Sequence, residues 1–158
     1  PLNDWYGEDM LYGGRVTLGL DALVGRGVMR LYVSHLDTRG VGGSGRARQA
    51  DEIRADADLP DRPGLQVVGG DLNTWTCNPL AVDCTTPPLA EELVRDFLAA
   101  GWSDGTAGWN SWTQLGAGFF PQRLDWLFYR GGAAVPGAGD PQAKGSDHLP
   151  IGFDIAPP

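Results

Sequence analysis

VVGGDLNTWT, residues Val67–Thr76, is the stretch of sequence that decides the fold. The apolar run Leu65–Val68 has the composition of a short buried strand, and it leads into a glycine pair, an aspartate and an asparagine. Side chains two positions apart in an extended segment face the same way, so Asp71 and Asn73 are expected to aim at one point. Leu72 would then turn back into the core. The glycines are expected to let the backbone turn sharply and approach a ligand closely.

A carboxylate beside a neutral amide suits a water molecule held for attack next to an oxygen that needs a hydrogen bond. A turn in which Asp71 and Asn73 only satisfy neighbouring backbone groups would produce the same letters. This stretch alone leaves both interpretations open.

The size and composition predict one packed domain, residues 1–158. A chain of 158 residues with 42% hydrophobic residues can form a single core, and its 24 glycines and 12 prolines indicate many short loops. No apolar run approaches the roughly 18 residues needed to span a bilayer, so stable membrane insertion is not expected. The net charge of −8 argues against binding nucleic acid on a broad basic surface. It leaves phosphate substrates open, because a carboxylate site that binds a divalent cation attracts phosphate.

The hydrophobic pattern predicts a mixed order of strands and helices. The first two expected strands form a hairpin that turns at Gly25–Gly27. Ser44 is a candidate cap for the first helix, and Gly101 is placed to end the second helix. This order predicts an α/β fold in which helices cover sheets. Strands are expected at Arg15–Val24, Val28–His35, Leu65–Val68, Leu124–Tyr129 and Ile151–Ile155, and helices at Arg46–Leu59 and Leu89–Ala100.

Four short segments each begin or end an apolar run and carry side chains capable of acid–base or metal chemistry. The two histidines of the chain both lie within them. The segments are SHLD (Ser34–Asp37), GGDLN (Gly69–Asn73), RLDWLF (Arg123–Phe128) and SDHLP (Ser146–Pro150).

In SDHLP, the adjacent side chains of Asp147 and His148 diverge and need separate partners. An aspartate bonded to one imidazole nitrogen fixes the tautomer and raises the basicity of the other nitrogen. Asp125 can be that partner if its strand lies beside the His148 segment, which would leave Asp147 for a cation. A capped loop before a strand would explain this motif equally well.

In this order and at these intervals, the four segments resemble the later motifs of the endonuclease/exonuclease/phosphatase superfamily. Its members include pancreatic-type deoxyribonuclease, bacterial sphingomyelinase, inositol polyphosphate 5-phosphatases and abasic-site endonucleases. The resemblance runs from about Arg15 to Ile155, and GRARQADEI resembles the helix that follows the first histidine of the family. It implies a deoxyribonuclease-like fold, a two-sheet α/β sandwich with helices outside.

The resemblance also implies a metal-dependent phosphoester hydrolase, a phosphodiesterase, nuclease or phosphatase, in which water attacks phosphorus. Asp71 would orient or deprotonate the water, and Asn73 would hold a phosphate oxygen. His148, oriented by Asp125, would stabilise the pentacovalent phosphorus centre. His35 would contact the phosphate or assist the leaving group.

A Mg²⁺ ion, with Mn²⁺ as the alternative, would neutralise charge on the phosphoryl oxygens and would be held by Asp147 and Asp71. The substrate stays open among nucleic acid, a phospholipid headgroup, and a sugar or inositol phosphate. No obligate protein partner is expected.

Two earlier motifs of the family are not recognisable before His35: an asparagine near the end of the first strand, and a metal-binding glutamate. Glu8 is the only glutamate upstream of His35, and it lacks a strand to deliver it. We therefore expect the C-terminal two-thirds of such a domain, incomplete at the N-terminus, with little or no hydrolytic activity by itself. The alternative is a non-catalytic or degenerate binding module that keeps the fold without the full metal site.

Cys77 and Cys84 are the only cysteines, and their spacing does not match a zinc pattern. A disulfide between them would pin a small loop and imply an oxidising, extracytoplasmic or secreted location. Two unpaired thiols in a cytosolic loop are the open alternative.

Overall fold

The computed structural model describes residues 17–37, 44–74, 92–107, 113–114, 123–139 and 145–156. Within these ranges the chain forms seven strands and two helices. The elements are β1 (Thr17–Val24), β2 (Gly27–His35), α1 (Ser44–Ala57), β3 (Leu65–Asp71), α2 (Glu92–Ala99), β4 (Ser103–Asp104), β5 (Asp125–Arg130), β6 (Ala133–Gly139) and β7 (Ile151–Ala156).

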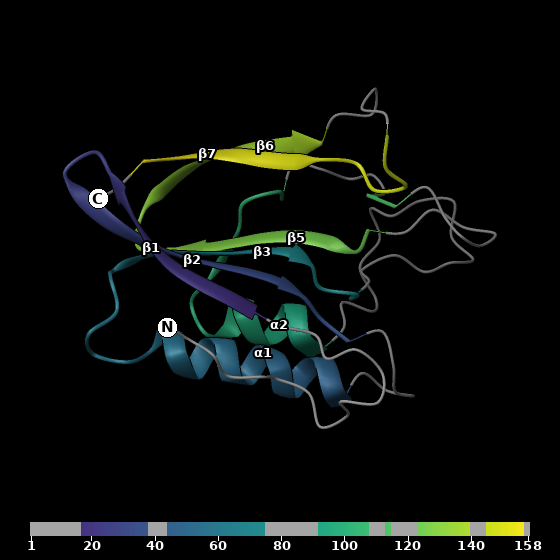
Figure 1. Ribbon diagram of the computed structural model, residues 1–158, viewed down its shortest axis with the longest axis horizontal. Helices are drawn as coiled ribbons and strands as arrows, with labels where there is room; N and C mark the ends of the chain where they lie inside the picture. Colours follow the sequence, from purple (N-terminus) through teal and green to yellow (C-terminus); the bar gives the residue numbers. More distant parts are fainter. Residues whose placement is uncertain are drawn as a thin grey trace.

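These elements stack in three layers (Figure 1). A five-stranded sheet of order β1-β2-β3-β5-β4 lies in the middle, with α1 and α2 on one face and the two-stranded sheet of β6 and β7 on the other. The expected class, an α/β fold with two sheets and external helices, is confirmed. Neither described helix is long and apolar enough to cross a membrane.

The predicted hairpin is confirmed, because β1 pairs antiparallel with β2 across the two-residue turn between Val24 and Gly27. The predicted helices and later strands are also present, although residues 89–91 lie outside the described residues. The chain then passes through α1 and returns as β3, which pairs parallel with β2. β5 pairs antiparallel with the other side of β3.

The sequence did not predict β4 or β6. β4 has only two residues, and β6 reads AAVPGAG, which is poor in the β-branched and aromatic residues that favour strands. β6 pairs with β7 through a register shift between Val135 and Ala138. A Cβ atom at Gly137 would lie 1.6 Å from the carbonyl oxygen of Gly152, so only glycine permits this close approach.

The main core lies between the five-stranded sheet and the helices. Tyr32, Val68 and Phe128 are register partners across β2, β3 and β5, and each is at most 1% exposed. Phe97 of α2 stacks on Phe128 with ring centroids 4.7 Å apart, and Trp126 stacks on the same ring at 5.6 Å. One face of α1 is also buried here, at Ala50, Ile53 and Ala57.

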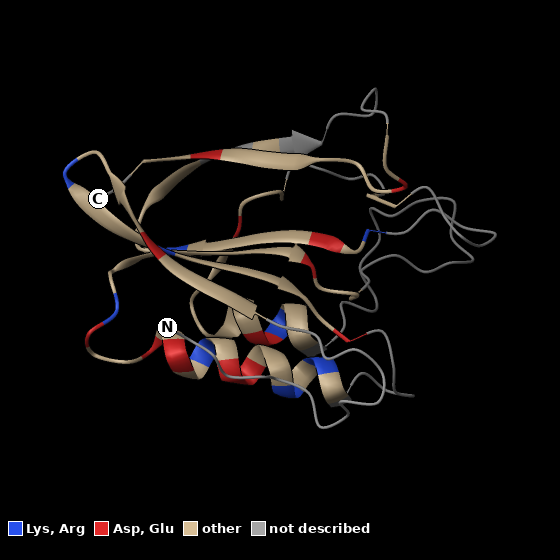
Figure 2. Cartoon of the chain, viewed as in Figure 1, with Lys and Arg blue, Asp and Glu red and all other residues tan. Residues whose placement is uncertain are grey.

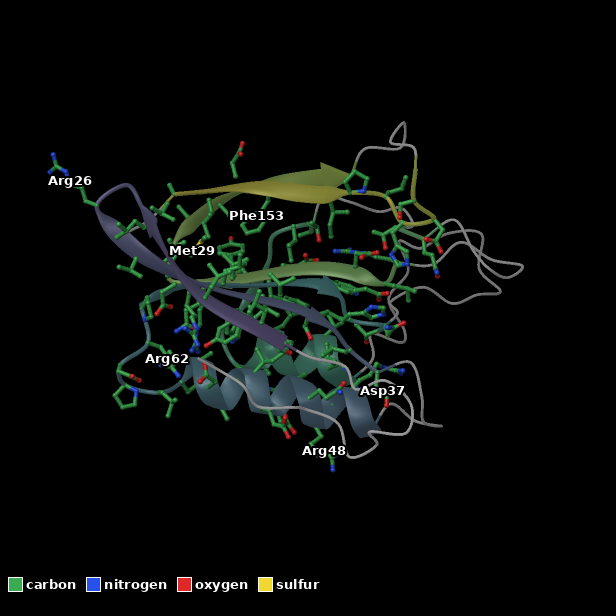
Figure 3. The ribbon with its side chains drawn as sticks, in the orientation of Figure 1. Arg26, Met29, Asp37, Arg48, Arg62 and Phe153 are labelled. Carbon is green, nitrogen blue, oxygen red and sulfur yellow. The ribbon has the colours of Figure 1, made fainter. Side chains whose placement is uncertain are left out.

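The second sheet covers only part of the opposite face. Phe153 points from β7 toward the five-stranded sheet (Figure 3), and its ring lies 5.4 Å from that of Tyr129 on β5. On β1 and β2 the same face stays open to solvent: Leu18 is 58% exposed and Val33 is 44% exposed. The two sheets of this structure therefore pack most closely along β5 and β7.

A cluster of charges around Asp56 joins the end of α1 to β1 and β2. Its carboxylate accepts hydrogen bonds from the hydroxyl of Tyr32 at 2.6 Å and from Nε of Arg62 at 3.1 Å, and Arg30 bridges to Asp21 at 3.1 Å. Burial alone would raise the pKa of Asp56, but the hydrogen bonds from Arg62 and Tyr32 lower it below its usual value. Burial, with the hydrogen bond to Asp56, raises the pKa of Tyr32 to about 12.

Asp56→Asn should lower the free energy of unfolding by about 1–2 kcal/mol at neutral pH, because Arg62, Arg30 and Tyr32 lose a charged hydrogen-bond acceptor that is only partly shielded from solvent. A folded pKa below the ordinary 3.8 means that this carboxylate stabilises the fold above that pH and loses its effect as pH falls through the lower folded value. Urea unfolding at a series of pH values should show the deficit shrinking in acid. Asp61→Asn is the control, since Asp61 is 77% exposed. A deficit that stays constant into strong acid would contradict this account.

Candidate active site

Three polar side chains form a line across one end of the five-stranded sheet. His35 ends β2, Asp71 ends β3 and Asp125 begins β5. The strand register pairs His35 with Asp71, and Asp71 with Asp125. Acidic positions accordingly lie side by side at the adjoining ends of β3 and β5 (Figure 2). The order of the strands thus brings three of the four sequence motifs together.

The fourth motif reaches this line from the second sheet. Because side chains alternate along a strand, His35, Asp71 and Asp125 lie on the face opposite Tyr32, the face on which β7 packs. His148 precedes β7, and its Nδ1 lies 2.7 Å from Oδ2 of Asp125. Its Nε2 lies 3.8 Å from Oδ2 of Asp71, and Nε2 of His35 lies 3.3 Å from the same oxygen. One carboxylate oxygen therefore faces two imidazoles.

The surroundings make Asp71 more basic than an ordinary aspartate. Burial raises the pKa of Asp71, and the nearby charge of Asp125 acts in the same direction. The hydrogen bond from the Asn73 backbone and the two imidazoles, His35 and His148, oppose this increase without cancelling it. A carboxylate of this kind accepts a proton more readily at neutral pH.

His148 is shifted toward its charged form. Burial would lower the pKa of His148, but the hydrogen bond to Asp125 and the charges of Asp125, Asp71 and Asp147 raise it above its usual value. The side chains of His148 and Asp125 are 24% and 15% exposed, so this pair is partly shielded from solvent. The backbone N–H of His148 donates to Oγ of Ser146 at 3.0 Å, which closes a turn just before the ring.

Asn73 does not continue the extended segment that the sequence pattern predicts. β3 ends at Asp71, and Asn73 has a positive φ of 49°. Its backbone N–H donates to Oδ1 of Asp71, and its side-chain amide donates to the carbonyl oxygen of Leu36, both at 2.9 Å. Asn73 is 7% exposed. It therefore ties the end of β3 to the end of β2, while Leu72 is fully buried as expected.

The glycine pair makes close contacts within the sheet. Gly70 has a φ of +133°, and a Cβ atom there would lie 2.0 Å from the carbonyl oxygen of Ser34. A Cβ atom at Gly69 would lie 2.6 Å from the side chain of Leu127. The glycines thus allow β3 to approach β2 and β5 closely. Their approach to a ligand stays a prediction.

Asp147 is exposed and adjoins His148. The part of the chain that the structure describes contains no group of three His, Cys, Asp or Glu residues that could hold a metal ion. Oδ1 of Asp71 already accepts a hydrogen bond from Asn73, and Oδ2 faces the two imidazoles. Mg²⁺ requires near-octahedral oxygen ligands, so the described residues do not fit a complete Mg²⁺ site on their own.

Arg123, to which the sequence assigned no role, anchors the start of β5. Its guanidinium lies 3.0 Å from Oδ2 of Asp104, donates to the hydroxyl of Thr106 and lies 3.9 Å from the centre of the Trp126 ring. The indole N–H of Trp126 donates to the carbonyl of Thr74, just after the GGDLN segment. These contacts join β4, β5 and the end of β3.

Thr113 was also missed by sequence reasoning. It is fully buried, and its hydroxyl lies 2.9 Å from the backbone nitrogen of Leu124 and 3.0 Å from that of Asp125. A threonine in GWNSWTQ carries no pattern that would distinguish it. Cys77 and Cys84 lie outside the described residues, so the disulfide and its alternative, two unpaired thiols, are untested.

Residues 4–148 match the model of the Endonuclease/Exonuclease/phosphatase family. Because the match covers most of the chain, the protein belongs to this family. No curated protein sequence is significantly similar to the chain.

Solved structures of the same architecture are similar to this chain. The mannosyl-6-phosphatase of Bacteroides thetaiotaomicron has a TM-score of 0.57 and 13% identity, over 84% of this chain and 52% of its own. The inositol polyphosphate 5-phosphatase domain of SpSynaptojanin, solved with inositol (1,4)-bisphosphate and calcium, has a TM-score of 0.56 and 18% identity, over 87% and 48%. D. rerio TDP2, complexed with a single-strand DNA product, has a TM-score of 0.62 and 17% identity, over 89% and 61%.

At these identities the likeness establishes the fold. The chain spans about half the length of two of these structures, the B. thetaiotaomicron phosphatase (52%) and the SpSynaptojanin domain (48%).

Gly70→Ala should lower the free energy of unfolding by about 3 kcal/mol or more, because the new methyl group meets the Ser34 carbonyl at a backbone conformation that suits glycine. Gly64→Ala is the matched control: a Cβ atom there meets nothing within 4 Å, so the change should stay within about 0.5 kcal/mol. Denaturant unfolding of both variants measures this. Equal free energies of unfolding for Gly70→Ala and Gly64→Ala would show that β2 and β3 do not lie as close together as described.

Proposed function

We propose that this chain carries the catalytic residues of a phosphoester hydrolase in which water attacks phosphorus. The observation that carries the proposal is the position of Asp71. Its carboxylate is partly buried, has a raised pKa, and lies between two imidazoles in a chain of the Endonuclease/Exonuclease/phosphatase family. Base, proton donors and an orienting acid thus lie within one cluster.

In the proposed step, Asp71 accepts a proton from water as the water oxygen forms its bond to phosphorus. The bond between phosphorus and the leaving oxygen breaks, and that oxygen departs with the electron pair and takes up a proton. A base with a raised pKa suits this transfer, because it holds the proton more firmly as the new bond forms.

The two imidazoles have different proposed roles in the reaction. His148 donates its Nδ1 proton to Asp125, which leaves Nε2 directed toward Asp71 and the reacting group. In its charged form it would donate to a phosphoryl oxygen and stabilise the negative charge that builds there. For His35, whose side chain is 50% exposed, the proposed role is to contact the phosphate or to protonate the leaving oxygen.

Asn73 retains one amide N–H and its carbonyl oxygen after its bond to Leu36. It could therefore still donate once to a phosphate oxygen, as proposed from the sequence. Its burial and its bond to Asp71 suggest that its first contribution is to hold the base in place.

We propose a small or flexible phosphoester as the substrate. The net charge of −8 disfavours a grip on long duplex nucleic acid. The solved relatives named above include a sugar phosphatase, an inositol phosphatase and a protein bound to single-strand DNA. Their range leaves the choice between a monoester and a diester to experiment.

Asp71→Asn should reduce hydrolysis of p-nitrophenyl phosphate or bis(p-nitrophenyl) phosphate by about 10²–10⁴-fold, because the amide cannot accept the proton of water. Single-turnover reactions with excess protein and Mg²⁺ or Mn²⁺ would detect even a small rate. Asp61→Asn is the matched control, with the same chemical change at an exposed carboxylate. Equal rates for the wild type and Asp71→Asn would remove Asp71 from the mechanism.

Divalent-metal dependence is proposed from family membership, and it needs its own test because the described residues do not assemble a metal site. Hydrolysis should stop with EDTA and return with excess Mg²⁺ or Mn²⁺. Hydrolysis unaffected by EDTA would contradict metal dependence.

The lack of a metal-binding group among the described residues favours a second candidate, a binding module that keeps the fold without a working metal site. For a module, inorganic phosphate should perturb the imidazole NMR signals of His35 and His148, yet neither metal ion should produce turnover. For the enzyme, the same perturbation should accompany metal-restored hydrolysis. Undisturbed imidazole signals, together with no turnover, would oppose both candidates.

A further inference from the structure

We propose that Thr113 is a positioning residue that sets the Asp125–His148 pair, acting on both partners from a single buried site. This inference deepens the proposed function, and its consequence for turnover rests on that function. The contacts that carry it are hydrogen bonds of Thr113 itself, made to two segments that lie far apart in the sequence.

The first contact fixes the aspartate. The hydroxyl oxygen of Thr113 accepts hydrogen bonds from the backbone N–H groups of Leu124 and Asp125, at 2.9 and 3.0 Å. These are the residues at which β5 begins, while β4 pairs with β5 only at Tyr129 and Phe128. The threonine hydroxyl therefore serves as an acceptor for N–H groups that β4 does not reach.

The second contact fixes the histidine. The carbonyl oxygen of Thr113 accepts a hydrogen bond from the backbone N–H of Leu149 at 2.6 Å, and Gln114 forms an antiparallel bridge with His148. Leu149 is 3% exposed, so the segment is held against the core directly after the imidazole. Thr113 is thus bonded through its side chain to one partner's backbone and through its main chain to the residue beside the other.

The Asp125–His148 hydrogen bond depends on a contact, such as those of Thr113, that holds its two residues at a fixed distance. Its two residues are 23 positions apart: Asp125 begins β5, and His148 precedes β7, which belongs to the other sheet. At 2.7 Å the bond is short, and a hydrogen bond weakens steeply once its distance or angle departs from the optimum. A shift of either backbone would release the imidazole from the tautomer that keeps Nε2 directed at Asp71.

Thr113→Val tests this role, because valine has nearly the same shape and lacks the acceptor oxygen. Nitrogen-15 spectra of the imidazoles at one fixed, neutral pH report which ring nitrogen of His148 carries the proton. The chain has only two histidines, so His35→Gln assigns the signals. We expect Nδ1 of His148 to be protonated in the wild type, and this signature to be lost in Thr113→Val and kept in Thr113→Ser.

Thr17→Val is the matched control. Thr17 is another buried threonine, and its hydroxyl lies 2.8 Å from that of Ser34. It should destabilise the fold while leaving the His148 signature intact. Loss of the signature in both valine variants would indicate general loosening and would overturn the inference. Retention of the signature in a folded Thr113→Val would overturn it as well.

Thr113→Cys covers the case in which the valine variant does not fold. Its thiol occupies a similar volume and is a weaker acceptor, so a partial loss of the signature is expected, and full retention would refute the role. In single-turnover hydrolysis, Thr113→Val should be slower by about 10–100-fold than Thr113→Ser. The spectra need no turnover, so the expected signatures would support the positioning role even if hydrolysis fails, and the test of the proposed function remains the comparison of Asp71→Asn with the wild type.

Discussion

The register of β2, β3 and β5 is the constraint on which the candidate site depends. His35, Asp71 and Asp125 come from three distant parts of the sequence, and they are neighbours because these strands pair residue for residue at one end of the sheet. A slip of one residue would turn a strand's side chains to the opposite face and move its polar residue into the helix-covered core. The same register places Tyr32, Val68 and Phe128 in that core. Burial of the apolar side chains therefore selects the alignment that assembles the polar ones.

Much of the fold follows from local pattern, and the remainder depends on contacts that pattern does not encode. Alternation predicted the hairpin of β1 and β2, and the hydrophobic pattern predicted both helices. The parallel pairing of β2 with β3 is a tertiary choice, and β6 forms despite its sequence because glycine permits its close approach to β7. The same is true of the site. Sequence order and family resemblance singled out the candidate residues, but the spacing could not show that they meet.

The errors of sequence reasoning share one physical cause, which is that polar residues at strand ends bond to nearby backbone. Of the two interpretations left open for Asp71 and Asn73, the extended segment is wrong, and the structure has the turn, in which the backbone N–H of Asn73 bonds to the carboxylate of Asp71. Thr113 gave no signal, because its importance lies in two backbone N–H groups that only the folded chain brings to it. Contacts of this kind depend on where a segment ends, and sequence periodicity is least informative at that point.

The site has an energetic cost within the sheet that bears it. Asp71 and Asp125 stand directly opposite one another on adjacent strands, and like charges in this position repel. His148 lies against both carboxylates and His35 lies against one, so positive charge on the imidazoles offsets the repulsion. A phosphate group would compete for those same imidazoles, and it would leave the two carboxylates less well compensated. Binding of substrate would then raise the proton affinity of Asp71 further, at the moment when the proposed reaction requires a base.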